Sequence, residues 1–344
     1  MRDSLDTAVA EAPGRLAFAR VNPLEYGEEI KELFVAHERP EFPAFFERTY
    51  PDVVADGAAS WVGRDEQGRI RAHIAQFPRP FRLGQRMVRG SLLANLMVSK
   101  THRTLWPALA LVRQLVNDSR ASGSVDFLYG DPNDGALAVL RAVGFRPVGA
   151  LRRFVLPLTD QRRSVDLGIR LYHLVGRIRA LAPLVVMARR ASEMPAGPDI
   201  VQVDSLGPVP KPAVYRHRLA GYPSSRDWWY SFHGPTSSER PIAAALVRGP
   251  DDRGLAVVCA LCCEPPTLLR SVLVGLARAL RARGVGRLEV SVMDDSPVAV
   301  GVRRAGFLRR PDAIPVVAMP LTPLGTEAIA VGAEWRLLPI DLDR

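Results

Sequence analysis

A short polar and basic turn in the first half of the chain has the residue types that bind an anion. The turn, residues 99–104, follows a strand-like apolar run at residues 91–98. Apolar side chains then recur at helical spacing, and Pro107 suits a first helical turn. These side chains are Leu105, Leu109, Val112, Leu115 and Val116. Because the first amides of a helix have no partner within it, a turn placed there favours phosphate.

A second strand and helix follow at once. The pattern predicts a strand at residues 125–129, a loop at 130–135 and a helix at 136–143 that Gly144 ends. The side chains of this stretch that can transfer a proton are Asp126, Tyr129 and Asp131. The two units together predict a phosphate-binding turn with acid and phenol groups nearby in sequence.

The order of these elements resembles the coenzyme-binding half of the GNAT superfamily of N-acetyltransferases. The features that carry the resemblance are the basic turn with Arg103, the pair Pro132-Asn133 and the pair Gly144-Phe145. The likeness is best over residues 93–158. It implies an α/β (α+β) fold with a mixed, mostly antiparallel sheet flanked by helices. It also implies acetyl-CoA as the co-substrate and a small-molecule amine as the acceptor.

In that family the backbone of a splayed strand holds the acyl group, the turn wraps the pyrophosphate of coenzyme A, and an Asn contacts the pantetheine arm. Carried over position by position, the resemblance implies that the coenzyme contacts Met97, Val98, Arg103, Thr104, Leu105, Trp106, Ala108 and Asn133. The turn departs from the family's glycine-rich pattern, which only its first and last residues match. Trp106 stands where bare backbone usually approaches phosphate, and Leu140 replaces the usual tyrosine.

Acyl transfer to an amine requires that the amine lose a proton. Asn95 occupies a frequent acid position of the family and can hold a water molecule there. Asp126 is a nearby carboxylate in sequence, and Tyr129 is the nearest phenol that can stand in for the missing tyrosine. The resemblance implies that the backbone amide of Val98 or its neighbour stabilises the oxyanion, and that the acyl group passes directly to the acceptor.

Length and charge set the broad class. The chain has 344 residues, enough for two domains of roughly 150 residues each. The net charge of +10 is compatible with nucleic acid. However, almost all the cations are arginines scattered through predicted helices, and lysine occurs only at Lys31, Lys100 and Lys211. We therefore do not expect nucleic acid as a partner, and assign part of the charge to coenzyme phosphates.

The three cysteines lie close together in one apolar run. Cys259, Cys262 and Cys263 include a Cys-x-x-Cys spacing, but the chain has no second pair and no histidine nearby in sequence. The run therefore predicts a buried strand and no metal site, and free thiols fit a reducing, cytoplasmic compartment. Residues 1–14 lack the apolar core of a signal peptide, and no run is long enough for a membrane helix.

The first half otherwise predicts a strand at residues 15–21, a helix at 23–37, and a loop that contains Phe42, Pro43 and Phe45. The ranges that follow as predicted strands are 59–63, 70–79, 83–88, 91–98, 146–149 and 151–158. Residues 161–192 read as a basic amphipathic helical segment. Such a segment either covers a neighbouring domain or lies against an anionic membrane, so the expected location is cytoplasmic with possible contact to the inner membrane.

The second half repeats the first in outline. Residues 133–145 and 295–307 both run to a Gly-Phe pair, with a helix predicted at 268–280 and a strand at 287–292. The turn between strand and helix lacks glycine and arginine there, so we expect no coenzyme. The predicted organisation is a disordered lead at 1–13, a GNAT domain at 14–158, a helical linker at 159–198 and a degenerate GNAT-like domain at 199–344.

The function that the resemblance implies is N-acyl transfer, with acetyl as the expected group. A looser likeness of the tandem layout to acyltransferases of cell-surface polysaccharide assembly makes an amino sugar the first acceptor to consider. One alternative is a peptidoglycan-type transferase that takes its acyl group from aminoacyl-tRNA. Another is a binding module that has kept the fold and lost turnover, which the changes at Thr104, Trp106 and Leu140 favour. The oligomeric state is left open.

Overall fold

The computed structural model describes residues 16–159, 184–190, 207–208, 227–233, 241–263, 266–331, 335 and 337. The chain divides into two compact units. The first comprises residues 1–77, 93–122 and 136–144, and the second comprises residues 78–92, 123–135 and 145–344. Strands β3 (Ile70–Leu83) and β4 (Arg86–Val98) contribute residues to both units. The domain boundaries predicted after residues 158 and 198 stay predictions.

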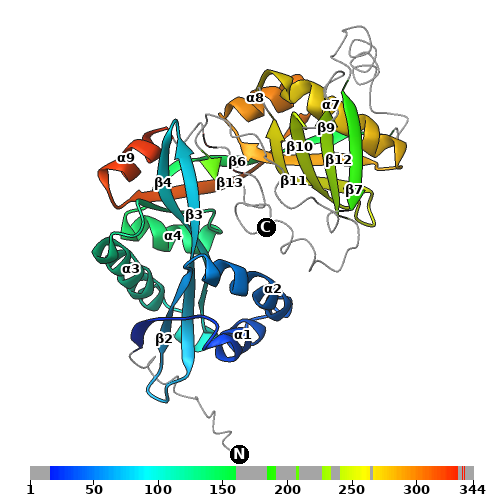
Figure 1. The fold of residues 1–344 in the computed structure, drawn as a ribbon. Helices are drawn as coiled ribbons and strands as arrows, with labels where there is room; N and C mark the ends of the chain where they lie inside the picture. The colour runs from blue at the N-terminus through cyan, green and yellow to red at the C-terminus, as the bar shows by residue number, and fades with distance from the viewer. Residues whose placement is uncertain are drawn as a thin grey trace, which may run out of the picture. The chain divides into compact units, whose positions relative to one another are not determined.

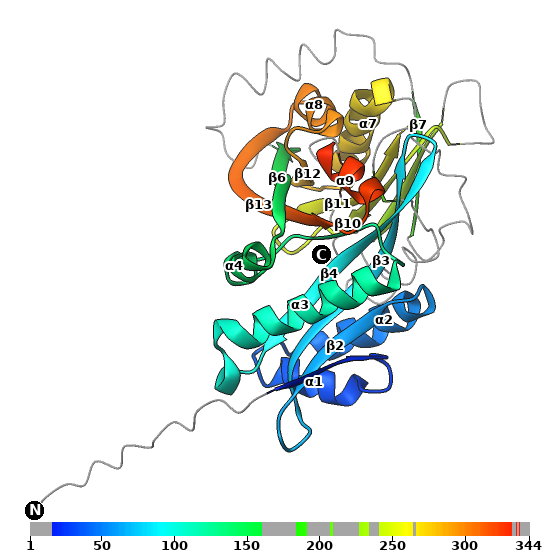
Figure 2. The same ribbon diagram turned by 90° about the vertical axis from the view of Figure 1, so that its left-hand side faces the viewer.

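The first unit is built on four antiparallel strands in the order β1-β2-β3-β4, with helices beside them (Figures 1 and 2). Its further elements are β1 (Ala17–Val21), α1 (Gly27–Val35), α2 (Phe42–Ala55), β2 (Ala59–Arg64), the 3-10 turn η1 (Lys100–His102), α3 (Leu105–Ser122) and α4 (Asp134–Val143). α3 follows the strand and turn that the sequence predicts, so the strand, basic turn and helix are confirmed.

Alternating side chains of β2 reach the helices on opposite faces of this sheet. The indole nitrogen of Trp61 donates a hydrogen bond to Asp118 on α3, at 2.7 Å. The neighbouring Ser60 faces His73 on β3, and the rings of Phe34 on α1 and Tyr50 on α2 pack against that histidine. α3 therefore covers one face, and α1 and α2 cover the other, which holds the buried polar groups described below.

The second unit repeats the order of strand, helix, strand and helix. Its elements are β5 (Phe127–Gly130), β6 (Arg146–Pro157), β7 (Val185–Arg190), β8 (Gly207–Pro208), β9 (Trp228–His233), β10 (Ala243–Arg248), β11 (Leu255–Cys263), η3 (Pro266–Leu268), α7 (Leu269–Ala282), β12 (Arg287–Met293), α8 (Pro297–Arg304), β13 (Leu308–Pro320) and α9 (Pro323–Ala330). β11 and β12 are parallel, as are β4 and β5, and each pair is joined through a helix. The predicted internal repeat is thus confirmed as a tandem fold.

The two halves of the chain exchange strands within this unit. β6, which follows the Gly144-Phe145 pair, lies between β12 and β13. β13 lies between β6 and β5 and is antiparallel to both. The strand order is therefore β4-β5-β13-β6-β12-β11-β10-β9-β7. β13 from the second half of the chain thus pairs with β5 of the first half, and β6 from the first half pairs with β12 of the second half.

Four predictions about elements are wrong. Residues 42–55 form helix α2 instead of a loop: Pro43 lies in its first turn, where proline is tolerated, and Phe42 and Phe46 are buried against α1. The strands predicted at 83–88 and 91–98 are one strand, β4, and those at 146–149 and 151–158 are one strand, β6. Residues 185–190 form β7, which pairs with β9, instead of continuing a helix.

The remaining predictions for residues 161–183 and 191–192, including contact with a membrane, lie outside the described residues, as does the disordered lead. None of the helices in the described ranges is long and apolar enough to cross a membrane. The cysteine run forms β11 as predicted. Burial there raises the pKa of the Cys259 thiol to about 11, which suits a packing role for this residue.

Candidate active site

Strand β4 contains a residue in the left-handed backbone conformation. Asn95 has a φ of 58°, although the residues on both sides of it belong to the strand. Asparagine tolerates this region better than most residues with a side chain. A left-handed residue inside a strand interrupts the ladder and turns the residues that follow, as in a β-bulge. We call this left-handed position in β4, four residues before the basic turn, the Asn95 bulge.

Buried side chains from three other elements hold Asn95 in place. The Nδ1 atom of His73 lies 2.9 Å from the Asn95 carbonyl oxygen, and the Nδ2 group of Asn95 donates to the Tyr50 hydroxyl at 3.1 Å. Ser60 Oγ lies 3.0 Å from the other ring nitrogen of His73. His73, Tyr50 and Ser60 are all fully buried. The bulge is therefore fixed on its main chain and on its side chain.

The burial of His73 decides its charge. Because the ring lies in an apolar environment, desolvation lowers its pKa from the ordinary 6.5 to about 4, and the hydrogen bond to the Asn95 carbonyl opposes this only in part. His73 is thus neutral at pH 7. Since a carbonyl oxygen can only accept, the proton sits on Nδ1, and Nε2 accepts from the Ser60 hydroxyl.

Replacing Asn95 tests how much the left-handed conformation costs. We expect Asn95→Ala to be less stable than Asn95→Gly by about 1 kcal/mol, because both lose the bond to Tyr50 but only alanine opposes a positive φ. Urea unfolding of the two variants measures the difference. Equal stabilities would mean that the backbone at this position is not left-handed in solution.

The register of β4 with β5 is short. Gly90, Ser91 and Leu92 pair with Phe127, Leu128 and Tyr129. β4 then continues to Val98, beyond this register and through the bulge. Met97 and Val98, which the resemblance implicates in holding the acyl group, lie in this last part and are half-buried.

Two hydrogen bonds from backbone amides fix the start of the turn that follows, and an ion pair lies beside them. Ser99 is buried, and its amide donates to the carbonyl of Arg71 on β3 at 2.7 Å. The Lys100 amide donates to Nε2 of His37, which follows α1, at 2.6 Å. The Lys100 ammonium pairs with Glu38 at 2.6 Å, and this bond, with a smaller effect of Arg103, lowers the pKa of the Glu38 carboxyl. The turn is thus anchored at its start and carries positive charge.

The later residues of the turn point into solvent. Arg103 and Thr104 are exposed, and Leu105 and Trp106 at the start of α3 keep 55% and 65% of their surfaces exposed. Ala108 is buried against the sheet. Since Trp106 stands away from the protein interior, its indole is not packed into the core below the turn. Asn95, Met97, Val98 and residues 103–108 all belong to the first unit.

The other predicted site residues, Asp126, Tyr129 and Asn133, belong to the second unit. Asn133 is exposed and directly precedes α4. Tyr129 is fully buried, and its ring packs edge-on against Phe81 and Trp335, with centroids 5.3 and 5.8 Å away. Its surroundings are those of a core residue, and its catalytic role stays a prediction.

Asp126 is a structural anchor. Its carboxylate accepts from the Arg89 backbone amide and from two nitrogens of the Arg89 guanidinium, at 2.8 to 3.1 Å, and from the Thr322 hydroxyl at 3.1 Å. Its backbone oxygen accepts from the amides of Leu321 and Thr322. Although burial opposes them, these bonds lower the pKa of the Asp126 carboxyl. A catalytic role for Asp126 is untested, and both its oxygens already have partners.

Asp126→Ala is expected to destabilise the protein by about 2 kcal/mol, because it leaves the Arg89 amide and the Thr322 hydroxyl without the buried carboxylate that accepts from them. The guanidinium of Arg89 is half exposed and regains water, which keeps the loss below that of a fully buried pair. Asp126→Asn, which keeps one oxygen acceptor, should lose less. Chemical denaturation measures both, and a loss below about 0.5 kcal/mol in the alanine variant would contradict the anchor.

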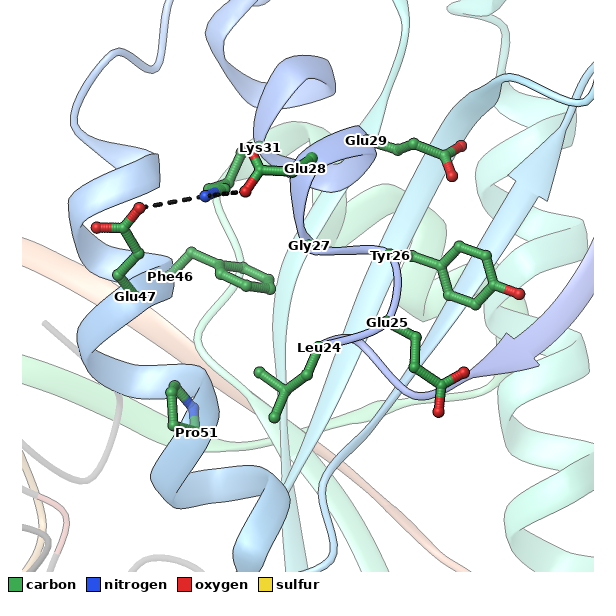
Figure 3. A pocket seen from close by; sticks show the side chains of 10 residues that line it. All are labelled: Leu24, Glu25, Tyr26, Gly27, Glu28, Glu29, Lys31, Phe46, Glu47 and Pro51. Carbon is green, nitrogen blue, oxygen red and sulfur yellow. Dashed lines mark hydrogen bonds and ion pairs between the residues drawn. The ribbon is translucent and has the colours of Figure 1, made fainter.

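A hollow of about 340 Å³ lies between the start of α1 and α2 (Figure 3). Its carboxylates are Glu25, Glu28, Glu29 and Glu47. Lys31 pairs with two of them, Glu28 at 2.7 Å and Glu47 at 3.1 Å, and Arg64 on β2 pairs with Glu29 at 3.2 Å. The opposite end of α1 leads to His37 and the turn after β4. The hollow thus lies at the end of α1 away from that turn, and much of its charge is balanced within the chain.

Sequence reasoning missed His73, Tyr50 and Ser60. The one available signal was a histidine and a serine inside apolar strands, which by itself predicts only buried hydrogen bonds. Among the residues that the structure describes, no three histidine, cysteine or carboxylate groups are placed to hold a metal ion.

The sequence matches no protein-family model and no curated protein. Similar solved structures cover about 90% of the chain. A GCN5-related N-acetyltransferase from Anabaena variabilis has a TM-score of 0.65 at 10% identity, with 90% of this chain and 74% of that chain covered. A tandem GNAT protein from the clavulanic acid biosynthesis pathway has a TM-score of 0.50 at 14% identity, covering 90% of this chain and 99% of that chain.

A third similar structure contains a GCN5-related glucosamine N-acetyltransferase region of a fungal multi-domain β-N-acetylglucosaminidase. Its TM-score is 0.53 at 13% identity, with 90% of this chain and 38% of that chain covered. These likenesses show that the chain has the fold of the GCN5-related N-acetyltransferases, in tandem form.

Proposed function

We propose that this tandem acetyltransferase-fold chain is an N-acyltransferase that moves an acetyl group from acetyl-CoA to an amine. The observation that carries the proposal is the left-handed Asn95 in β4, directly before a basic turn and a helix start. A fixed bulge of this kind removes backbone groups from the ladder and so makes them available to a ligand. Asn95 lies in the strand that leads to the basic turn, and this order supports the proposal that the turn binds the coenzyme.

The residues of the turn fit the phosphates of coenzyme A. The start of α3 supplies backbone amides and the positive end of the helix dipole. Arg103 is exposed beside these amides and adds a charge able to make charge-assisted hydrogen bonds. The exposed Leu105 and Trp106 leave the helix start accessible from solvent. Acetyl-CoA would supply the activated thioester, and the chain would bind and orient it through Arg103, Thr104 and the backbone after Asn95.

For the acceptor we propose an amino sugar, and glucosamine is the compound to test first. Support comes from the tandem layout and from the name of the fungal neighbour, which is a glucosamine N-acetyltransferase region. Transfer would be direct: Cys259 is buried with a raised thiol pKa, Cys263 is buried, and the half-buried Cys262 belongs to the second unit, whereas Arg103 and Asn95 belong to the first. The peptide N–H groups after the bulge would stabilise the charge that develops on the acyl oxygen.

Calorimetric titration with acetyl-CoA tests the first step. We expect binding, and we expect Arg103→Ala to weaken it about tenfold, the effect of losing one charge-assisted hydrogen bond. Arg113→Ala is the matched control, because Arg113 is exposed further along the same helix and should leave the affinity unchanged. If acetyl-CoA does not bind the intact protein, the proposed function is wrong.

One observation favours a second candidate, a binding module without turnover. Leu140 occupies the position of the family's usual proton donor and is buried, and Tyr129, the phenol nearest to it in sequence, is buried among other rings. Release of free coenzyme A thiol in the presence of glucosamine and other amines distinguishes the two candidates. Binding of acetyl-CoA without thiol release against every amine tested would favour the module.

A further inference from the structure

His73 makes a directional contact with the main chain of the bulge. Its Nδ1–H donates to the Asn95 carbonyl oxygen, and its Nε2 accepts from Ser60, so both ring nitrogens have partners. The ring therefore has one tautomer and one orientation. Phe34 packs against it edge-on at 5.6 Å, and Tyr50 lies on another side at 6.4 Å. These contacts keep the imidazole from turning.

The geometry of the peptide unit carries the effect of His73 to the next residue. In a trans peptide the carbonyl and the N–H group of the same plane point in opposite directions. The carbonyl of Asn95 is held towards the His73 ring, so the N–H of Leu96 points away from that ring. The Asn95 side chain is tied separately to Tyr50, which limits rotation of the residue as a whole.

We propose that His73 is a positioning residue for acyl transfer: by holding the Asn95 carbonyl it aims the peptide N–H of Leu96 at the oxygen of the bound acyl group. This inference rests on the proposed function. The backbone amide expected to contact the oxyanion is then that of Leu96 instead of that of Val98. His73, although buried, would affect acyl transfer through this amide. A neutral imidazole suits this role, because it donates a fixed hydrogen bond without placing a charge in the core.

Three variants separate positioning from simple packing. His73→Leu fills the space and removes the donor. His73→Asn keeps an N–H donor near the position of Nδ1. Ser60→Ala leaves the ring in place but frees Nε2, so that the imidazole can adopt the wrong tautomer. Thermal unfolding shows whether each variant is folded, and only folded variants are compared.

The probes are coenzyme A and acetyl-CoA labelled with ¹³C at the carbonyl. In the wild type we expect acetyl-CoA to bind more tightly than coenzyme A, and the bound carbonyl resonance to move downfield because its oxygen accepts a hydrogen bond. In His73→Leu the preference for acetyl-CoA should fall about fivefold, the effect of one hydrogen bond, and the downfield shift should be lost. Affinity for coenzyme A itself should stay the same.

His73→Asn should restore most of the preference and of the shift, and Ser60→Ala should fall between the two. A packing role alone would lower the unfolding temperature without changing the ratio of the two affinities or the resonance. If folded His73→Leu keeps both wild-type values, the inference is wrong while the proposed function stands. If the wild type binds neither compound, both are wrong.

Discussion

Gly325→Ala is expected to destabilise the protein by about 4 kcal/mol, the upper end of the range for a single substitution. Gly325 lies in the first turn of α9, and a Cβ atom built on it would fall 1.9 Å from the backbone oxygen of Asp126 and 2.7 Å from its carbonyl carbon. Backbone atoms cannot move aside as a side-chain end can. The helix would have to leave Asp126, and the bonds from Thr322 to that residue would break.

Gly275→Ala is the matched control. This glycine lies within α7, and the nearest atoms to a Cβ there are side-chain carbons at 3.4 Å or more. Because alanine favours a helix over glycine, we expect this variant to be unchanged or more stable, by up to about 1 kcal/mol. Urea unfolding of both proteins gives the comparison. Similar stabilities for the two variants would show that α9 does not sit on Asp126.

The buried histidine should make stability depend on pH. His73 has a pKa of about 4 in the folded protein and an ordinary value of 6.5 when exposed. As the pH falls below 6.5 the unfolded chain takes up the proton first, so the free energy of unfolding falls with it. Between pH 7 and pH 4 this residue alone should remove about 3 kcal/mol of stability. The contribution is fully present above pH 6.5 and lost on acidification to the folded pKa.

Carboxylates with lowered pKa values, such as Asp126, also destabilise the fold in acid, so the wild type alone does not isolate the histidine. The informative quantity is the difference between wild type and His73→Asn, measured by urea unfolding at pH 7 and at pH 4. Stability of the wild type should fall by about 3 kcal/mol more than that of the variant. Parallel losses would place the ring in contact with water.

The sequence predicted the parts of the fold that depend on local pattern. The helix after the basic turn, the Gly-Phe pairs and the cysteine strand each have a period or a breaker that short-range physics explains. α2 was missed because Pro43 and a cluster of phenylalanines resemble a loop, whereas the helix is favoured by packing of Phe42 against α1 and of Tyr50 against β3.

The site was harder to predict, because its geometry depends on contacts between distant residues. The sequence around Asn95 does not indicate that this residue has a positive φ. That conformation is held by contacts with His73 on β3 and Tyr50 on α2, which are distant in sequence. The partner of Asp126, Thr322, lies far along the chain, so a carboxylate that looked available for catalysis proved to be engaged. Residue types indicated the kind of chemistry, while tertiary packing decided which groups have partners.

The exchange of β6 and β13 has a consequence for how the protein is made. A ribosome releases Phe127–Gly130 and Arg146–Pro157 long before it reaches Leu308–Pro320, the strand that separates them in the finished sheet. Until then the nascent chain exposes two strand edges whose native neighbours have not been synthesised, and such edges attract foreign strands. The sheet of the first half is therefore completed only after β13 has been synthesised, and a fragment that stops before β13 would leave both edges exposed.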